Sequence, residues 1–147
     1  MAQNPPEGFP RITPYLFYRD VAGALDFLTR AFGFHERLRL PAPDGSIAHA
    51  EIELGDGVVM MGNPAGDYRN PKEHGHHSQL LYIYVDDVDN HCELAEAGGA
   101  IIVSALEEKV YGDRAYIAED PEGHQWNFAQ HVRDVSPEEM AQTPATA

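Results

Sequence analysis

The chain has 147 residues, of which 43% are hydrophobic, a length and composition that suit one compact domain with a sizeable core. Its formal net charge of −14 at pH 7 argues against binding to the phosphate backbone of nucleic acids. It has no apolar run of about 18 residues and no basic, apolar leader, so we expect neither a membrane partner nor a signal peptide. A single cysteine, Cys92, excludes an internal disulfide and is typical of a cytoplasmic protein.

The first half of the chain predicts a strand, a helix and three further strands after a flexible, proline-rich arm at residues 1–10. Asp20 is a typical helix N-cap, apolar residues recur after it at helical spacing, and Gly33 ends the helix. Alternating apolar and polar residues on both sides of a Gly-Asp-Gly turn predict a β-hairpin. The predicted elements are a strand at 12–19, a helix at 21–32 and strands at 34–40, 47–54 and 58–62.

The second half repeats this order after a linker at 63–78 that is rich in Gly, Pro, His and Asn. Its hairpin turns at Asp120-Pro121-Glu122-Gly123, residue types that favour a tight turn. A Ser-Pro-Glu-Glu segment at 136–139 predicts a short helix within residues 134–147, followed by a frayed tail. The predicted elements are a strand at 79–85, a helix at 87–97, a strand at 100–104 and a hairpin at 113–129.

This succession is an internal repeat, which predicts an α+β fold of two βαβββ modules in tandem. Asp20 and Asp87 correspond at an offset of 67 residues, which also pairs Tyr15 with Tyr82. In the hairpins we align Ala50 with Ala115. We expect one domain at 11–133, made of module one (11–62), the linker and module two (79–133).

The motifs ITPYL at 12–16, AHAEIELGDGVVMMG at 48–62, YVDDVD at 84–89 and YGDR…DPEGHQW at 111–126 carry a family resemblance. The chain resembles the vicinal oxygen chelate superfamily, which contains glyoxalase I, bleomycin-resistance proteins and extradiol dioxygenases, and within it the PhnB-like branch. The resemblance implies that each module forms half of an open barrel, that the concave faces enclose a ligand or metal cleft, and that the protein is a homodimer.

Strand alternation predicts which side chains face that cleft, because successive residues point to opposite faces of a sheet. We expect a wall of aromatic and a few polar side chains, which suits a small organic ligand. Trp126 falls on the opposite parity and is expected in the core against a helix. The predicted ligand-binding residues are Tyr15, Phe17, His49, Met60, Tyr82, Tyr84, Arg114, Tyr116 and Asn127.

Arg114 has two interpretations at the level of sequence. It is the best candidate among them for contact with an anionic group, and it is equally a candidate for a structural ion pair with Glu51 or with its neighbour Asp113.

The resemblance also places four metal-ligand positions, one on each opening strand and one on each final hairpin strand. In this sequence they fall on Thr13, Met60, Leu80 and Asn127, residue types that do not suit a divalent cation. We therefore predict no metal site and no cofactor. The alternative is a displaced Zn, Ni, Mn or Fe site, for which His49 with Glu51 or the histidines of residues 74–77 are the candidate ligands.

Two functions of different class remain. The first is a homodimeric, metal-free protein that binds a small, partly aromatic or cationic molecule, sequestering an antibiotic or a metabolite as bleomycin-resistance members do. The second is a glyoxalase-type lyase or isomerase in which His49 and Glu51 are catalytic, acting as general base or with a displaced metal. Dioxygenase chemistry is less favoured because the usual metal ligands are missing.

Overall fold

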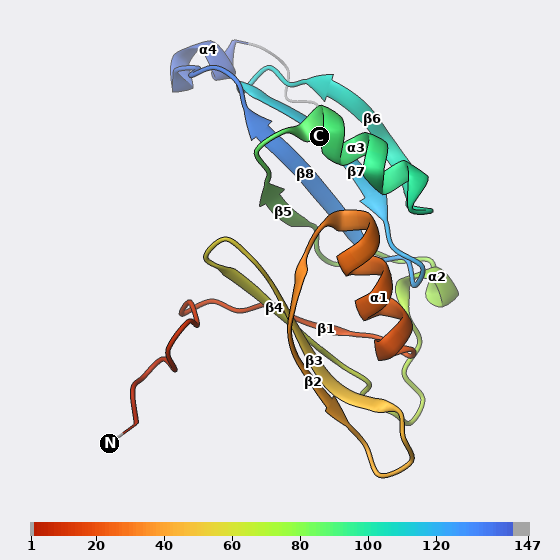
Figure 1. Cartoon of the computed structure of the whole chain (residues 1–147). Coiled ribbons are helices and arrows are strands. Elements are labelled where there is room, and N and C mark those ends of the chain that lie inside the picture. The colour runs from red at the N-terminus through yellow and green to blue at the C-terminus, as the bar shows by residue number, and fades with distance from the viewer. Residues whose placement is uncertain (1, 143–147) are drawn as a thin grey trace. The chain divides into compact units, whose positions relative to one another are not determined.

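The computed structural model describes residues 2–142 and contains the predicted repeat (Figure 1). Each module gives one four-stranded sheet, with strand order β1-β4-β3-β2 in the first and β5-β8-β7-β6 in the second. The first and last strands of a module pair in parallel, and the remaining pairs are antiparallel. The identical order and pairing confirm the prediction of tandem βαβββ modules.

Module one comprises β1 (Tyr15–Phe17), α1 (Val21–Phe32), β2 (His35–Pro41), β3 (Ile47–Leu54) and β4 (Gly57–Gly62). The Asp20 side chain accepts a hydrogen bond from the Gly23 N–H and caps α1, and Gly33 ends the helix in the left-handed conformation. Both ends of α1 were therefore predicted correctly. The first strand is shorter than the predicted segment at 12–19.

Module two comprises β5 (Leu81–Tyr84), α3 (Val88–Ala97), β6 (Ile101–Glu108), β7 (Asp113–Glu119) and β8 (Gln125–His131). β6 runs four residues beyond the predicted end at 104. A short C-terminal helix, α4 (Pro137–Ala141), is capped by Ser136 as predicted, while residues 143–147 of the expected frayed tail lie outside the described residues. The predicted linker contains one further helical turn, α2 (Pro71–His74).

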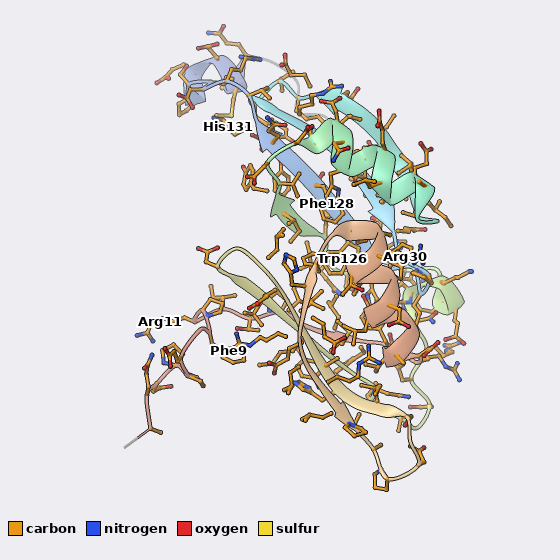
Figure 2. All side chains as sticks on the ribbon, in the orientation of Figure 1. Phe9, Arg11, Arg30, Trp126, Phe128 and His131 are labelled. Carbon is orange, nitrogen blue, oxygen red and sulfur yellow. The ribbon has the colours of Figure 1, made fainter. Side chains whose placement is uncertain are left out.

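Helices α1 and α3 each cover one face of the sheet in their own module, and the core of each module lies between helix and sheet. In module one, Leu25 and Leu28 of α1 and Ile52 and Met61 of the sheet are fully buried. In module two, the buried Trp126 and Phe128 project from β8 (Figure 2) and the Phe128 ring contacts His91 of α3. The core position predicted for Trp126 is thus confirmed. We call the face of each sheet that its helix leaves uncovered the open face.

The turn between β7 and β8 belongs by its contacts to the first of two compact units. The first compact unit comprises the residues up to His76 together with residues 121–123, and the second unit comprises the other residues after His76. The buried Glu122 carboxylate accepts hydrogen bonds from the backbone N–H groups of Arg19 and Asp20, at 2.7 and 2.9 Å. It also accepts a bond from the Asn70 side chain at 3.0 Å. Gly123 has φ +90°, and a Cβ there would lie 2.6 Å from the Lys72 backbone nitrogen, so the turn requires glycine.

The N-terminal arm forms no helix or strand over the part that is described, residues 2–10. It nevertheless contacts the first sheet. The Arg37 guanidinium lies 4.4 Å from the centre of the Phe9 ring and donates a hydrogen bond to the Glu7 carbonyl at 3.4 Å.

Candidate functional site

The open face of the first sheet carries the residues that alternation assigned to it in module one. Tyr15 of β1 pairs with Met60 of β4, which pairs in turn with Glu51 of β3, so these three side chains form one row across the sheet. His49 and Phe17 lie two residues along their strands on the same face. The structure therefore brings together five predicted site residues of module one.

A continuous chain of polar side chains crosses this face. The Tyr15 hydroxyl lies 3.0 Å from His49 Nδ1, and His49 Nε2 lies 2.8 Å from Glu51 Oε2. Glu51 is buried, and its other oxygen lies 3.4 Å from the Arg37 guanidinium. Because a carboxylate only accepts, Nε2 of His49 donates to Glu51, and in the tautomer with its single proton on Nε2 the Nδ1 atom accepts from the Tyr15 hydroxyl. We call this the module-one chain: Tyr15, His49, Glu51 and Arg37.

A glycine makes room for the tyrosine end of the chain. Gly62 lies opposite His49 in the ladder between β3 and β4, and a Cβ at Gly62 would lie 2.5 Å from the Tyr15 hydroxyl oxygen. Any side chain at this position would displace the hydroxyl. The glycine that ends β4 therefore permits the contact between Tyr15 and His49.

Exposed apolar side chains surround the module-one chain. Tyr15 and Phe17 are 47% and 46% exposed, and their rings meet edge to face at 6.0 Å. Leu38 and Leu40 of β2 pair with Glu51 and His49 and are likewise exposed. An apolar surface with a few fixed polar groups is the arrangement found in binding sites for organic molecules.

The open face of the second sheet is built around a buried carboxylate, Asp113. Its Oδ2 accepts hydrogen bonds from the hydroxyls of Tyr82 and Tyr84, at 2.6 and 3.0 Å. Its Oδ1 lies 2.7 Å from His131 Nδ1, and His131 Nε2 lies 2.7 Å from Asp134. We call this the module-two cluster: Tyr82, Tyr84, Asp113 and His131.

The pKa values of the module-two cluster follow from these bonds. Burial opposes ionisation of Asp113, but hydrogen bonds from Tyr82, His131 and Tyr84 outweigh it and lower its pKa. Burial and the bond to Asp113 raise the pKa of both tyrosines. The hydrogen bonds with Asp134 and Asp113 raise the pKa of His131. At neutral pH the cluster therefore contains an ionised carboxylate held by donors on both oxygens.

Arg114 and Tyr116 do not lie on the open face, and the prediction that placed them there is wrong. The Arg114 guanidinium pairs with Asp89 of α3 at 2.8 Å, and the Tyr116 hydroxyl is buried 2.6 Å from His91 Nδ1 of the same helix. Neither ion pair proposed for Arg114 is present, because Glu51 pairs with Arg37 and Asp113 with His131.

The error has a physical cause in the lengths of the hairpin turns. Residues 55–56 connect the paired ends of β3 and β4, whereas residues 120–124 connect those of β7 and β8. The longer turn moves the register by one residue, so Ile117 and not Tyr116 lies opposite Asn127, as Glu51 lies opposite Met60. Ile117 consequently lies on the open face.

Asn127, the last predicted ligand-binding residue, lies on the open face of the second sheet. It pairs with Tyr82 on one side and Ile117 on the other. It is 4% exposed, and within residues 2–142 its side-chain nitrogen has no hydrogen-bond partner.

Sequence reasoning missed Arg37 and the central role of Asp113. A β-bulge between Glu36 and Leu38 changes the alternation of β2 at Arg37, and nothing in the residue types indicates it. Asp113 is the first residue of its strand. The sequence did contain one indication of its role: Tyr82, Tyr84 and His131 can all donate hydrogen bonds from one face of the sheet, which suggests a shared acceptor.

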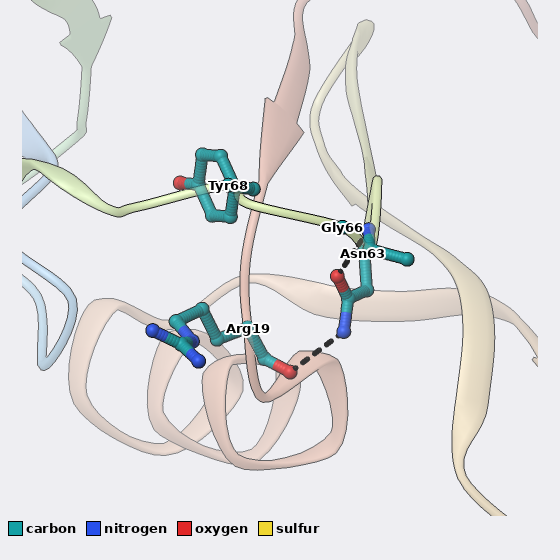
Figure 3. A pocket seen from close by; sticks show the side chains of 5 residues that line it. Arg19, Asn63, Gly66 and Tyr68 are labelled. Atoms are coloured by element: carbon teal, nitrogen blue, oxygen red, sulfur yellow. Dashed lines mark hydrogen bonds between the residues drawn. The ribbon is translucent and has the colours of Figure 1, made fainter.

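A cavity of about 170 Å³ lies in the first unit, lined by Arg19, Asn63, Ala65, Gly66 and Tyr68 (Figure 3). Its polar groups are engaged within the protein. Asn63 binds the backbone of Arg19 and Ala65, Tyr68 donates to the Phe17 carbonyl, and Arg19 pairs with Glu73. Organic ligands occupy cavities of roughly 300 to 1,000 Å³, so this one is too small to be the main site.

The four positions that the resemblance assigns to metal ligands do not suit a metal ion. Met60 and Asn127 occupy equivalent places in the two sheets, opposite Tyr15 and Tyr82, and neither offers a charged or imidazole donor. Of the candidate histidines, His74 stacks on His76 and His77 lies 3.3 Å from Glu119. Among residues 2–142 no three His, Cys, Asp or Glu side chains are close enough to share an ion. That the protein works without a metal remains a prediction.

Comparison with known proteins identifies the family. Residues 8–128 match the model of the glyoxalase/bleomycin resistance protein/dioxygenase superfamily, and the chain belongs to this family. The match is to the superfamily, and membership of the PhnB-like branch remains a prediction. No helix within residues 2–142 has the length and apolar composition that crossing a membrane would require.

Several relatives extend over nearly the whole chain. An uncharacterized protein of Mycobacterium bovis is 35% identical over 136 residues, which cover 89% of this chain and 90% of that protein. The crystal structure of TioX from Micromonospora sp. ML1 is 38% identical with a TM-score of 0.70, covering 84% of this chain and 99% of TioX. TnmS3, an antibiotic binding protein from Streptomyces sp. CB03234, is 19% identical with a TM-score of 0.61 and coverages of 82% and 93%, which shows a shared fold.

Proposed function

We propose that the protein binds a small, partly aromatic organic molecule on the open faces of its sheets, as a metal-free homodimer. The observation that carries this proposal is the pairing of exposed aromatic rings with immobilised polar groups on each open face. Phe17 packs beside Tyr15 of the module-one chain, and Tyr82 and Tyr84, 40% and 59% exposed, are held by Asp113. Rings fixed in this way lose little conformational entropy on binding, which favours affinity.

The fold is compatible with such a role, since TnmS3 is described as an antibiotic binding protein. Sequestration of an antibiotic or a metabolite in the cytoplasm is the corresponding proposal for this chain. Exposure of the apolar side chains on the open faces to water is unfavourable, and a second copy of the chain would bury part of this surface. Sedimentation equilibrium of the untagged protein tests the dimer directly.

The binding proposal is tested by thermal shift with a panel of planar aromatic compounds, both neutral and cationic. A ligand raises Tm by mass action, and Phe17→Ala and Tyr84→Ala should each reduce that rise. The matched control is Leu94→Ala, which removes a large, 57% exposed side chain from α3. An equal loss of ligand response in Leu94→Ala would contradict the assignment to the open faces.

The module-one chain favours a second candidate, a proton-transfer enzyme of lyase or isomerase type. Glu51 orients the His49 ring, and Nδ1 can accept a hydrogen bond from the Tyr15 hydroxyl. Tyr15 and His49 together can therefore exchange a proton with a bound substrate. Wash-in of deuterium at the α-carbon of 2-hydroxyacetophenone in D₂O, followed by NMR, tests this chemistry. His49→Gln should abolish the exchange and spare binding, whereas unchanged exchange would contradict the role of His49.

A further inference from the structure

Asn127 is the one residue in the described part of the chain with a buried side-chain polar atom that lacks a hydrogen-bond partner. The residues on either side of it in β8, Trp126 and Phe128, point into the core, so the Asn127 side chain points to the open face. A buried amide N–H without an acceptor costs free energy, and proteins retain such a group where it has a use.

The fold itself does not require an amide at this position. The equivalent residue of module one, opposite Tyr15 as Asn127 is opposite Tyr82, is Met60. In module one the polar side chain lies on the neighbouring strand: Glu51 pairs with Met60 across the sheet, and its carboxylate has His49 and Arg37 as partners. Module two has the apolar Ile117 in that place and the unsatisfied amide on β8.

The surroundings of Asn127 favour a neutral acceptor over a cation. Asp113 is the carboxylate of the adjacent cluster, and its two oxygens already accept from Tyr82, Tyr84 and His131. Both tyrosine hydroxyls donate inward to Asp113, so the rings remain for contact with a ligand. The face therefore offers aromatic surface and the unpaired N–H donor of Asn127.

We propose that the Asn127 amide donates a hydrogen bond to a carbonyl oxygen of a planar aromatic ligand that packs against Tyr82 and Tyr84. This inference rests on the proposed binding function and narrows its ligand to a neutral aromatic carbonyl compound. Asn127 lies between Tyr82 and Ile117 in the sheet, so a ligand that packs against the partly exposed Tyr82 ring lies beside the amide.

The test compares 9-fluorenone with fluorene, which have the same ring skeleton with and without the carbonyl group. We expect the wild-type protein to bind fluorenone about tenfold more tightly than fluorene, in titrations followed by ligand or protein fluorescence. Asn127→Leu and Asn127→Ala should each reduce this ratio to about one. Because Leu replaces an unsatisfied polar group by an apolar one of similar shape, Asn127→Leu should also leave the ligand-free Tm unchanged or raise it.

Leu94→Ala is the control, since it removes an exposed side chain of α3 away from the open faces and should keep the preference for fluorenone. A ratio unchanged in both Asn127 variants would overturn the inference, as would a ligand-free Tm lowered by about 5 °C or more in Asn127→Leu, which would make the amide a structural group. If the wild-type protein binds both compounds equally, the binding function is supported and the proposed hydrogen bond from Asn127 to a carbonyl group is refuted. If it binds neither, both proposals fall together.

Discussion

The two open faces share a backbone plan and differ in the charge behind their tyrosines. Tyr15 and Tyr82 occupy equivalent positions in their sheets. The Tyr15 hydroxyl meets a histidine, and the chain behind it ends at the Arg37 guanidinium. The Tyr82 hydroxyl meets a carboxylate directly. The opening strands thus direct both tyrosines to the open faces, while side chains two strands away in each sheet decide which chemical group each hydroxyl meets.

The largest effect is expected from Asp113→Ala, which removes the centre of the module-two cluster. Two tyrosine hydroxyls and His131 would lose their buried acceptor, and we expect a loss of about 3 kcal/mol in the free energy of unfolding. Urea denaturation followed by fluorescence measures it. Asp134→Ala, which removes a fully exposed carboxylate of the same network, should cost little. A loss below about 1 kcal/mol for Asp113→Ala would show that the cluster does not support the sheet.

Glu51→Gln should have an intermediate effect, about 1.5 kcal/mol in the same denaturation assay. The amide can still accept one hydrogen bond, and Arg37 keeps its second partner, Glu53. Glu53→Gln on the same strand is the control, and because that carboxylate is partly exposed its removal should cost less. If Glu51→Gln proved as costly as Asp113→Ala, the contrast between the two faces would not hold.

The two tyrosines should differ when each loses its hydroxyl. Tyr82→Phe should cost about 1 kcal/mol, because the hydroxyl donates to an ionised carboxylate. Tyr15→Phe should cost about 0.5 kcal/mol, since its partner is a partly exposed imidazole and not a carboxylate. Paired urea denaturation curves of the two variants give the order, and the reverse order would refute the charge difference as its cause.

The smallest effect is expected from His131→Ala, and it depends on pH. The pKa of His131 is raised above its ordinary value of 6.5, so its stabilising contribution is complete below pH 6.5 and is lost as the pH rises through the folded-state pKa. The Tm difference between wild type and variant should therefore be larger at about pH 5.5 than at about pH 8.5. His35→Ala on the exposed face of β2 serves as the control. A difference that grew with pH would contradict the proposed pairing of His131.

The sequence predicted the element order, the repeat and the open face of module one because these depend on local signals. Caps at Asp20 and Gly33 and period-two alternation in β3 are such signals. The register of β7 was not predictable in the same way, since it depends on the length of a turn whose ends are fixed only by pairing. Arg37 was missed for a related reason, because a bulge alters parity without altering composition. The contacts of Asp113 arise between strands far apart in sequence, which alternation alone does not bring together.

The turn at residues 121–123 has a consequence for how this repeat could be taken apart. Each module has the strands and helix of a self-sufficient unit, yet Glu122 satisfies N–H groups at the start of α1 and the turn groups with residues before the division after His76. A gene fragment that stops at residue 76 would lack that carboxylate and leave those donors to water. Exchange of module one among relatives should therefore succeed more often when the residues equivalent to 121–123, from the turn between β7 and β8, are exchanged with it.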